Sequence, residues 1–508
     1  MSGIVSGRVQ SNRRRVLSLL LAAVLTVPVA GAVHAQSLDK LIDRLEKLER
    51  ENRELRKEIE AIKAAQNRKP PSPPAAAAGP ARAYGKSPAG FVRTDSQFGY
   101  EILDPTNAIN RKERLVLHRK RDGILAPGGL YLQGAITPIA NHQSSNRADK
   151  FGYLMRHPTA KNQVGKTVSE AAIHSVQLGA TATLGDWIAG HAQALFDPEQ
   201  SFGAGTNTSI DRNQLQMRQA WVLFGDFDRS PFYASLGKMA VPFGLTDTVN
   251  PFTASTVWHA FGGLANGVKA GYSQQGLNLT LMGIQGGAQF RAANTPVKGT
   301  AVPGLLNNLA VDASYELRLD RVGTLLLGGS YQRGSAYCQD YPVQHFEPCR
   351  DNNPAFGIYG RLITGPFTFK AELARTTDVW PGTFNPDMPQ FAASKVTAFD
   401  LGAKYRLERG GGPLDLSVEF SRFTAGPGGA PWEKQDQIVL GVAWFVEPSV
   451  KLFAEVVRTA GYAPLNFISG GSIMAMDPDG TRKVDNTRTH SDRSARSSIL
   501  LVGANVAF

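Results

Sequence analysis

After its first thirty residues, the 508-residue chain has no apolar run long enough for a transmembrane helix. Charged residues make up only 19% of the sequence, and the two cysteines are the only source of a disulfide. The missing apolar runs exclude a helical membrane protein. The chain is therefore either soluble or a membrane β-barrel.

The sequence also lacks the elements of catalysis. It contains nine histidines but no G-x-S-x-G element, and no feature links His142, His174, His191 or His259 to a nucleophile. The acidic DPDG at 477–480 lacks the ligand spacing of a calcium loop and is typical of a turn. We therefore expect no enzyme, no metal site and no cofactor.

The N-terminus predicts a removable signal peptide over residues 1–35. Three arginines at 13–15 precede the apolar run 16–29, and VHA at 33–35 offers a cleavage site. The four arginines of this segment have no acidic counterpart, so the formal charge falls from +12 to +8 in a chain starting at Gln36. This mild surplus requires no nucleic-acid partner. An oxidising envelope permits Cys338 and Cys349 to pair, with two free loop thiols as the alternative.

The last stretch, Ser494 to Phe508, predicts the closing strand of a barrel. Counting back by twos from Phe508 places Val506, Ala504, Val502 and Leu500 on one face. A strand that ends on Phe resembles the recognition signal of the barrel-assembly machinery. The alternative is a core strand that happens to end the chain.

Residues 37–66 predict a coiled coil in which apolar positions step by three and four residues. The predicted core is Leu38, Leu41, Leu45, Leu48, Asn52, Leu55, Ile59 and Ile62. The g and e positions pair opposite charges, which favours a parallel homo-oligomer over a lone surface helix. Asn52 favours two strands, whereas sixteen-stranded porins are usually trimers. We expect a trimer rather than a dimer, with the number left open.

Two further segments precede the barrel. Residues 67–90 are rich in Pro and Ala and predict an extended spacer. Within the basic segment 91–128, a short cationic helix is expected between an N-cap at Asp104 and a stop at Gly123. It is either a plug or charged collar at the pore mouth or a solvated helix between spacer and barrel, and we favour the solvated helix.

From residue 129 to 508 the chain predicts a sixteen-stranded antiparallel outer-membrane β-barrel. Val311 to Leu319 alternates most clearly, with Asp312, Glu316 and Arg318 facing inward. A soluble sandwich can show the same alternation. The strands are predicted at 129–139, 170–184, 187–197, 213–225, 231–243, 264–273, 276–285, 309–319, 321–333, 354–364, 366–377, 395–408, 413–424, 434–447, 449–459 and 494–508. Their connections alternate between long and short, and both termini lie on the short-turn side, the expected periplasm.

A barrel of this strand number leaves an aqueous channel, so function depends on what narrows it. The third long connection, 244–263, is either a constriction loop, with Asp247 and His259 near the narrowest point, or an ordinary external loop. It contains no Lys or Arg. Candidate pore-lining charges are Arg218, Lys238, Asp312, Glu316, Arg318, Lys370, Glu372, Asp400, Lys404 and Arg406, together with Asp415 and Glu419. Mixed charge favours a transverse field that passes polar solutes broadly.

Two runs carry a family resemblance. LGDWIAGHAQALFDPE at 184–199 and RQAWVLFGDFDRSPFYASLGKMAVPFG at 218–244 are similar to the LbtU-type siderophore-porin family. The resemblance implies an outer-membrane channel, with ferric siderophores among its possible solutes. The Gly-Lys…Pro-Phe run at 237–244 also resembles a strand of phosphate-selective porins, but the cation-free loop 244–263 departs from their pattern.

Together these features predict a porin of the bacterial outer membrane, with the coiled coil in the periplasm, that passes small polar solutes by passive diffusion. The expected partners are outer-membrane lipid, further copies of the chain, the barrel-assembly machinery and the cell wall. The alternative function is a structural anchor that tethers the outer membrane to the cell wall through the coil.

Overall fold

The computed structural model describes residues 91–508 except 149, 152–164, 197–214, 286–305, 307, 339–351, 381–382, 386–387, 390–393, 463–471, 477–481 and 486–490. The chain divides into two compact units, 1–86 and 87–508. The predicted signal peptide, coiled coil and spacer lie outside the described residues. In the described part, no helix has the length and apolar character needed to cross a membrane.

Within the described residues, seventeen strands form one sheet. Sixteen of them make an antiparallel wall, and the seventeenth, β1 (Val92–Thr94), pairs parallel with the first strand of that wall. The sixteen are β2 (Leu130–Ser145), β3 (Thr167–Leu184), β4 (Ile188–Phe196), β5 (Leu215–Gly225), β6 (Phe232–Ala240), β7 (Leu264–Gln274), β8 (Leu277–Ile284), β9 (Asn308–Leu319), β10 (Gly323–Gln332), β11 (Ala355–Thr364), β12 (Phe367–Thr376), β15 (Thr397–Leu407), β16 (Leu414–Thr424), β17 (Lys434–Glu447), β18 (Val450–Tyr462) and β21 (Asp492–Ala507).

The connections add smaller elements. Two hairpins pair β13 (Thr383–Asn385) with β14 (Met388–Pro389) and β19 (Ser472–Met476) with β20 (Arg482–Asp485). A 3₁₀ turn, η1 (Ala336–Cys338), carries the first cysteine. Its expected partner Cys349 lies outside the described residues, so the disulfide stays a prediction.

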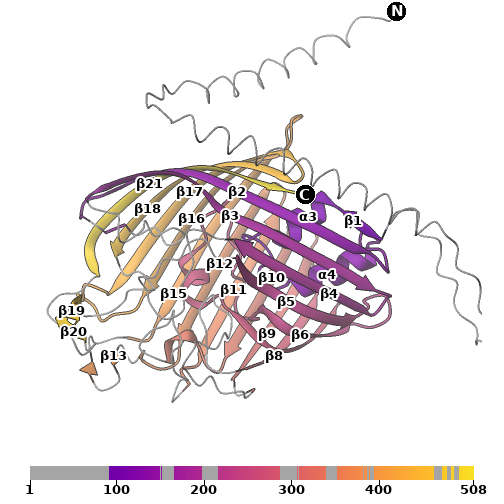
Figure 1. The fold of residues 1–508 in the computed structure, drawn as a ribbon, viewed down its shortest axis with the longest axis horizontal. Helices are drawn as coiled ribbons and strands as arrows, with labels where there is room; N and C mark the ends of the chain where they lie inside the picture. The colour runs from indigo at the N-terminus through magenta and orange to yellow at the C-terminus, as the bar shows by residue number, and fades with distance from the viewer. Residues whose placement is uncertain are drawn as a thin grey trace, which may run out of the picture. The chain divides into compact units, whose positions relative to one another are not determined.

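The wall closes because its first strand pairs antiparallel with its last, from Ala135 opposite Ala507 to Ser145 opposite Ser497. Figure 1 shows β2 and β21 side by side. Closure removes the free edges whose unpaired backbone groups are costly in lipid. The predicted sixteen-stranded barrel is confirmed. The largest difference in bounds is at β2, which continues to Ser145 and pairs with β3 beyond a bulge at Thr137 and Pro138.

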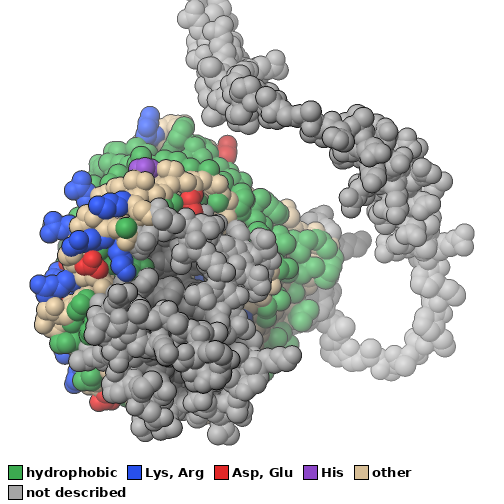
Figure 2. All heavy atoms as spheres, turned by 60° about the vertical axis from the view of Figure 1, so that its left-hand side comes forward, with side chains coloured by type: hydrophobic (Ala, Val, Ile, Leu, Met, Phe, Trp, Pro, Cys, Tyr) green, Lys and Arg blue, Asp and Glu red, His purple; other side chains and the backbone are tan. Residues whose placement is uncertain are grey.

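Side chains alternate between an apolar outer face and a polar lumen. On β9, Val311 and Tyr315 are exposed whereas Asp312 and Ser314 are buried. The same alternation runs along β16 and β21, and on β21 the predicted outward face of Leu500, Val502 and Val506 is confirmed. Hydrophobic side chains cover much of the visible wall, and Lys and Arg gather at its rim (Figure 2). This is the pattern of a wall between lipid and an aqueous interior.

The connections differ in length between the two ends of the barrel, as predicted. One end has only tight turns, and glycines at 185, 276 and 365 supply the positive φ that such hairpins need. The other end carries the long connections, including 146–166, 241–263 and 463–491. The start of β2 and the end of β21 both lie at the short-turn end.

Between β1 and β2 the chain forms two helices, α3 (Ser96–Leu103) and α4 (Lys112–Arg121). Asp95 caps α3 by accepting a hydrogen bond from the Phe98 N–H at 2.8 Å. Phe98 and Leu117 are buried in one cluster with Tyr131 of β2 and Trp221 of β5, both of which face inward. Residues 95–127, the luminal segment, therefore lie inside the barrel.

The expectation of one solvated helix starting at Asp104 is wrong. Asp104 ends α3 and its carboxylate accepts hydrogen bonds from Thr106, while α4 begins only at Lys112. The segment packs inside because α3 and α4 each carry apolar side chains that match apolar luminal positions of the wall.

Candidate channel lumen

The third long connection folds into the barrel. Every residue from 241 to 257 is buried, and the short helix α5 (Thr256–Phe261) contacts β12, β15 and β16. Ser255 caps α5 by accepting a hydrogen bond from the Trp258 N–H. We call residues 241–263 the inner loop. Three luminal carboxylates, one each from β12, β16 and β18, bind its backbone.

Glu372 of β12 holds the start of the inner loop. Its two carboxylate oxygens accept hydrogen bonds from the Leu245 N–H at 2.8 Å and the Thr246 N–H at 3.0 Å. Gly244 has φ +69°, and a Cβ there would lie 2.1 Å from a Glu372 oxygen. Only glycine lets the chain turn this close to the carboxylate.

Glu419 and Glu455 hold the middle of the inner loop. Glu419 accepts hydrogen bonds from the Val249 N–H, the Thr248 hydroxyl and the Asn250 side-chain amide, all at 3.0–3.2 Å. Glu455 accepts from the Phe252 N–H at 2.8 Å and the Thr253 N–H at 3.0 Å. Next to it, the Lys451 ammonium donates to the Pro251 carbonyl at 2.7 Å.

A buried cation balances part of this charge. The Lys370 ammonium lies 2.8 Å from Asp400 and 3.6 Å from Glu372, and all three side chains are at most 1% exposed. These charges bind one another or the inner loop and do not face water. Lys370, Glu372, Asp400 and Glu419, which were expected to line the pore, face the lumen and support the inner loop.

The luminal segment is held by an ion pair and a cage of carbonyls. Glu113 of α4 pairs with Lys269 of β7 at 2.5 Å, and both side chains are almost fully buried. The Lys112 ammonium donates to the carbonyls of Glu101, Asp104 and Asn107 at 2.7–3.1 Å. Burial lowers the pKa of Lys112 to about 8, although Asp104 and Asp247 attract the proton.

The end of α4 contacts the short turns of the wall. The half-buried His118 ring lies 5.0 Å from the Phe227 ring, and Lys120 donates to the Asp186 carbonyl at 2.6 Å. Burial, then the nearby Arg121 and Arg114, lower the pKa of His118 to about 4. His118 is therefore neutral at physiological pH.

The luminal segment and the inner loop meet at Asp247. One Asp247 oxygen lies 2.6 Å from the Arg111 guanidinium and 3.3 Å from that of Arg361 on β11. Arg111 also donates to the Leu245 carbonyl at 3.0 Å, and Asn110 donates to the Gly244 carbonyl at 2.7 Å. The junction links two segments more than 130 residues apart.

Five further predicted residues face the lumen, and most of them are bound to other side chains. Asp312 is luminal but accepts hydrogen bonds from Ser330 and Tyr359. Glu316 and Arg318 follow it in the same row and reach water near the short turns. Lys404 and Arg406 are luminal and share one carboxylate, Asp415, at 3.6 and 2.7 Å.

Two candidates do not fit the predicted lining, and a third occupies an irregular position. Arg218 is the extra residue of a bulge in β5 opposite Gln193 and Ala194, and it acts electrostatically on Lys112 of the luminal segment. Lys238 lies opposite Ala220 and Asn266 in the outward-facing row of the wall. Its ammonium donates to the Met217 carbonyl. His259 is fully buried because α5 packs it against the wall, so its expected place beside the water path is wrong.

Several important residues were not predicted: Arg111, Glu113, Lys269, Arg361, Lys451 and Glu455. Arg361 follows Gly357 and Tyr359 at every second position of β11, and Glu455 follows Lys451 and Phe453 on β18. The period-two pattern of the strands places Lys269, Arg361, Lys451 and Glu455 in the lumen and could have found these four. No such pattern marks Arg111 and Glu113, which lie at the start of α4.

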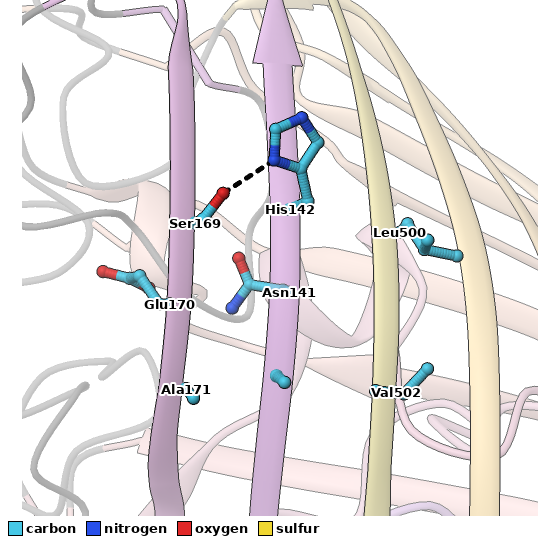
Figure 3. Close-up of a pocket in the computed structure, with 8 residues that line it drawn as sticks. Asn141, His142, Ser169, Glu170, Ala171, Leu500 and Val502 are labelled. Carbon is cyan, nitrogen blue, oxygen red and sulfur yellow. Dashed lines mark hydrogen bonds between the residues drawn. The ribbon is translucent and has the colours of Figure 1, made fainter. Parts of the chain in front are cut away.

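The outer face has a shallow depression across β21, β2 and β3. His142 and Ser169 are hydrogen-bonded at 2.7 Å between β2 and β3, near Leu500 and Val502 of β21 (Figure 3). His142, Leu500 and Val502 belong to exposed outward rows. The depression is therefore separate from the lumen.

No protein-family model matches the chain. A UPF0422 protein of Coxiella burnetii is 26% identical over 261 residues, which are 49% of this chain and 50% of that protein. The chain thus spans about half the length of the curated relative that it matches.

Three solved structures are similar to the barrel. The outer membrane channel DcaP of Acinetobacter baumannii is 14% identical, covers 75% of this chain and 97% of its own, and has a TM-score of 0.46. The anion-selective porin from Comamonas acidovorans is 12% identical, covers 75% of this chain and 99% of its own, and has a TM-score of 0.45. OprB of Pseudomonas putida is 8% identical, covers 74% of this chain and 94% of its own, and has a TM-score of 0.46. All three scores are below 0.5, and the fold assignment depends on the strand pairing of this chain itself.

Proposed function

We propose that this chain forms a channel in the bacterial outer membrane through which small polar solutes or ions diffuse passively. The observation that carries the proposal is a closed sixteen-strand wall, apolar outside and charged inside, whose lumen holds two ordered elements. Wall side chains alone do not fill a barrel of this width. The inner loop and the luminal segment therefore set the size of the aperture.

The aperture lies where these two elements meet, beside Asp247, Arg111 and Arg361. Arg361 is 28% exposed and Arg111 16% exposed, so both reach the water that enters the lumen. The crowding favours small solutes over a ferric siderophore. In this proposal the short turns face the periplasm, which also places the N-terminal coil there.

Single-channel recording in planar bilayers tests the proposal. The purified full-length protein should give small stepwise currents in potassium chloride, and deleting 95–127 should raise the unit conductance because it empties part of the lumen. A deletion variant that inserts and conducts like the parent would contradict the role of the segment. No current from either protein would contradict the channel and favour the structural anchor.

The same recordings address the finer proposals. A ferric siderophore that blocks the current at low concentration would identify it as a solute, and phosphate serves as the comparison. Current steps in groups of three would support a trimeric assembly.

A further inference from the structure

The acidic side chains of the lumen are largely withdrawn from water. The side chains of Asp400 and Glu372 are fully buried, the Asp247 side chain is 4% exposed, and Glu419 and Glu455 are each 1% exposed as whole residues. Each of the glutamates accepts hydrogen bonds from the inner loop, as described above. A passing solute therefore cannot contact these carboxylates directly, because their oxygens are occupied by the inner loop, by Lys370 or by Arg111 and Arg361.

The basic side chains near the short turns remain in contact with water. The side chains of Arg361, Lys404 and Arg406 are 28%, 23% and 41% exposed. They form two clusters of the same composition: Arg111 and Arg361 share Asp247, and Lys404 and Arg406 share Asp415. Each cluster has two cations and one carboxylate and so carries a surplus of one positive charge.

The other charges nearby do not cancel this surplus. Among the described residues of the luminal rows at this end, the acidic side chains that reach water are Glu316 and Glu408. The exposed Arg318 follows Glu316 on the same face, and Glu408 follows Arg406 and acts on it electrostatically. On α4, the half-buried Arg114 interacts electrostatically with luminal Asp312 and Tyr233. With these residues included, six accessible cations (Arg111, Arg114, Arg318, Arg361, Lys404 and Arg406) lie against four carboxylates (Asp247, Glu316, Glu408 and Asp415), so the accessible charge of this half of the lumen is positive.

We infer that the lumen passes small anions in preference to cations, and that Arg361 and Lys404 are selectivity-determining residues. The inference depends on the proposed channel function. In 0.1 M salt the Debye length is about 10 Å, so cations on the wall act on an ion that passes within several ångströms. A single unit charge about 8 Å away changes the local concentration of a monovalent ion on the order of twofold.

The test is the reversal potential of the full-length protein in a bilayer that separates concentrated from dilute potassium chloride. The current through the wild-type protein should reverse at a potential whose sign is that of the chloride equilibrium potential. Arg361→Gln and Lys404→Gln should each lower the chloride-to-potassium permeability ratio on the order of twofold, and the double variant more. The matched control is Arg422→Gln, because Arg422 pairs with Asp436 on the outward row of β16.

The outcomes separate the two proposals. Current with potassium preference, or with equal shifts in the luminal and control variants, would overturn the anion inference and leave the channel intact. Absence of current from the wild type would overturn the channel and the inference with it. Heat-dependent migration in gels shows whether each variant has folded, and if one of the two luminal variants does not fold, the other carries the test against Arg422→Gln.

Discussion

Removing the Glu419 carboxylate should loosen the inner loop. Glu419→Ala leaves the Val249 N–H without an acceptor inside the barrel, whereas the Thr248 hydroxyl and the Asn250 amide keep only the Thr253 carbonyl, at 3.3 and 3.1 Å. A buried donor without a partner costs about 1–3 kcal/mol. With the weaker bonding of the other two donors added, the substitution should cost about 2–4 kcal/mol, a sizeable fraction of the stability of a small domain.

The effect on the loop should be partial because Glu372 still holds residues 245 and 246 and Glu455 still holds residues 252 and 253. We expect the barrel to remain folded while the middle of the inner loop becomes mobile. Single-channel traces of Glu419→Ala should show added current fluctuation and a higher mean conductance. Limited proteolysis of protein in detergent should cut between residues 247 and 255, where the parent resists.

Two variants make the result interpretable. Glu419→Gln keeps the side-chain shape and one acceptor oxygen, so its effect should be smaller. Glu447→Ala removes an exposed carboxylate at the end of β17 and should behave like the parent. If Glu419→Ala gave parental traces and parental protease resistance, the reasoning that this carboxylate holds the loop would be refuted.

Three further predictions concern the luminal segment and the coil. Because the Glu113 and Lys269 side chains are buried together, Lys269→Glu should destabilise the packing of α4 in the lumen by about 3–5 kcal/mol and so raise the conductance. Adding Glu113→Lys to this variant should restore much of the parental current. The pKa of His118 is lowered to about 4 from 6.5. The packed position of α4 in the lumen is therefore most stable above pH 6.5 and loses stability as the pH falls towards 4. Allowing for its partial exposure, the loss is about 2 kcal/mol, and conductance should rise over that range in the parent but not in His118→Phe; a flat parental profile would contradict this. Deleting residues 37–66 should weaken oligomerisation on native gels without preventing insertion, and unchanged assembly would count against the predicted coil.

The wall could be predicted from the sequence because its pattern is local. Each strand shows its two faces within about ten residues, as on β9, where Asp312 and Ser314 alternate with Val311 and Tyr315. Turn glycines and connection lengths then give the strand count and the end of the barrel to which each loop belongs.

The arrangement of the lumen depends on pairings that no local pattern encodes. Glu372 binds Thr246 across 126 positions of the sequence, and Glu455 binds Phe252 across 203 positions. The alternation shows that such carboxylates face inward, but not whether they meet water or a loop. The luminal segment was misjudged for a related reason: its many charges favour solvent, whereas Glu113 pairs with Lys269 of the wall and Lys112 binds carbonyls that only the fold of the segment brings together.

The position of α3 has a consequence for the order of assembly. This helix contacts β2, β3 and β21, and a Cβ at Gly99 would lie 2.6 Å from the carbonyl oxygen of Phe508. The site in which α3 packs therefore includes Phe508, directly after the closing strand. That site cannot be complete until β21 has paired with β2, so the luminal segment reaches its final position only when the wall closes. The segment is then enclosed at the moment when the two ends of the wall join.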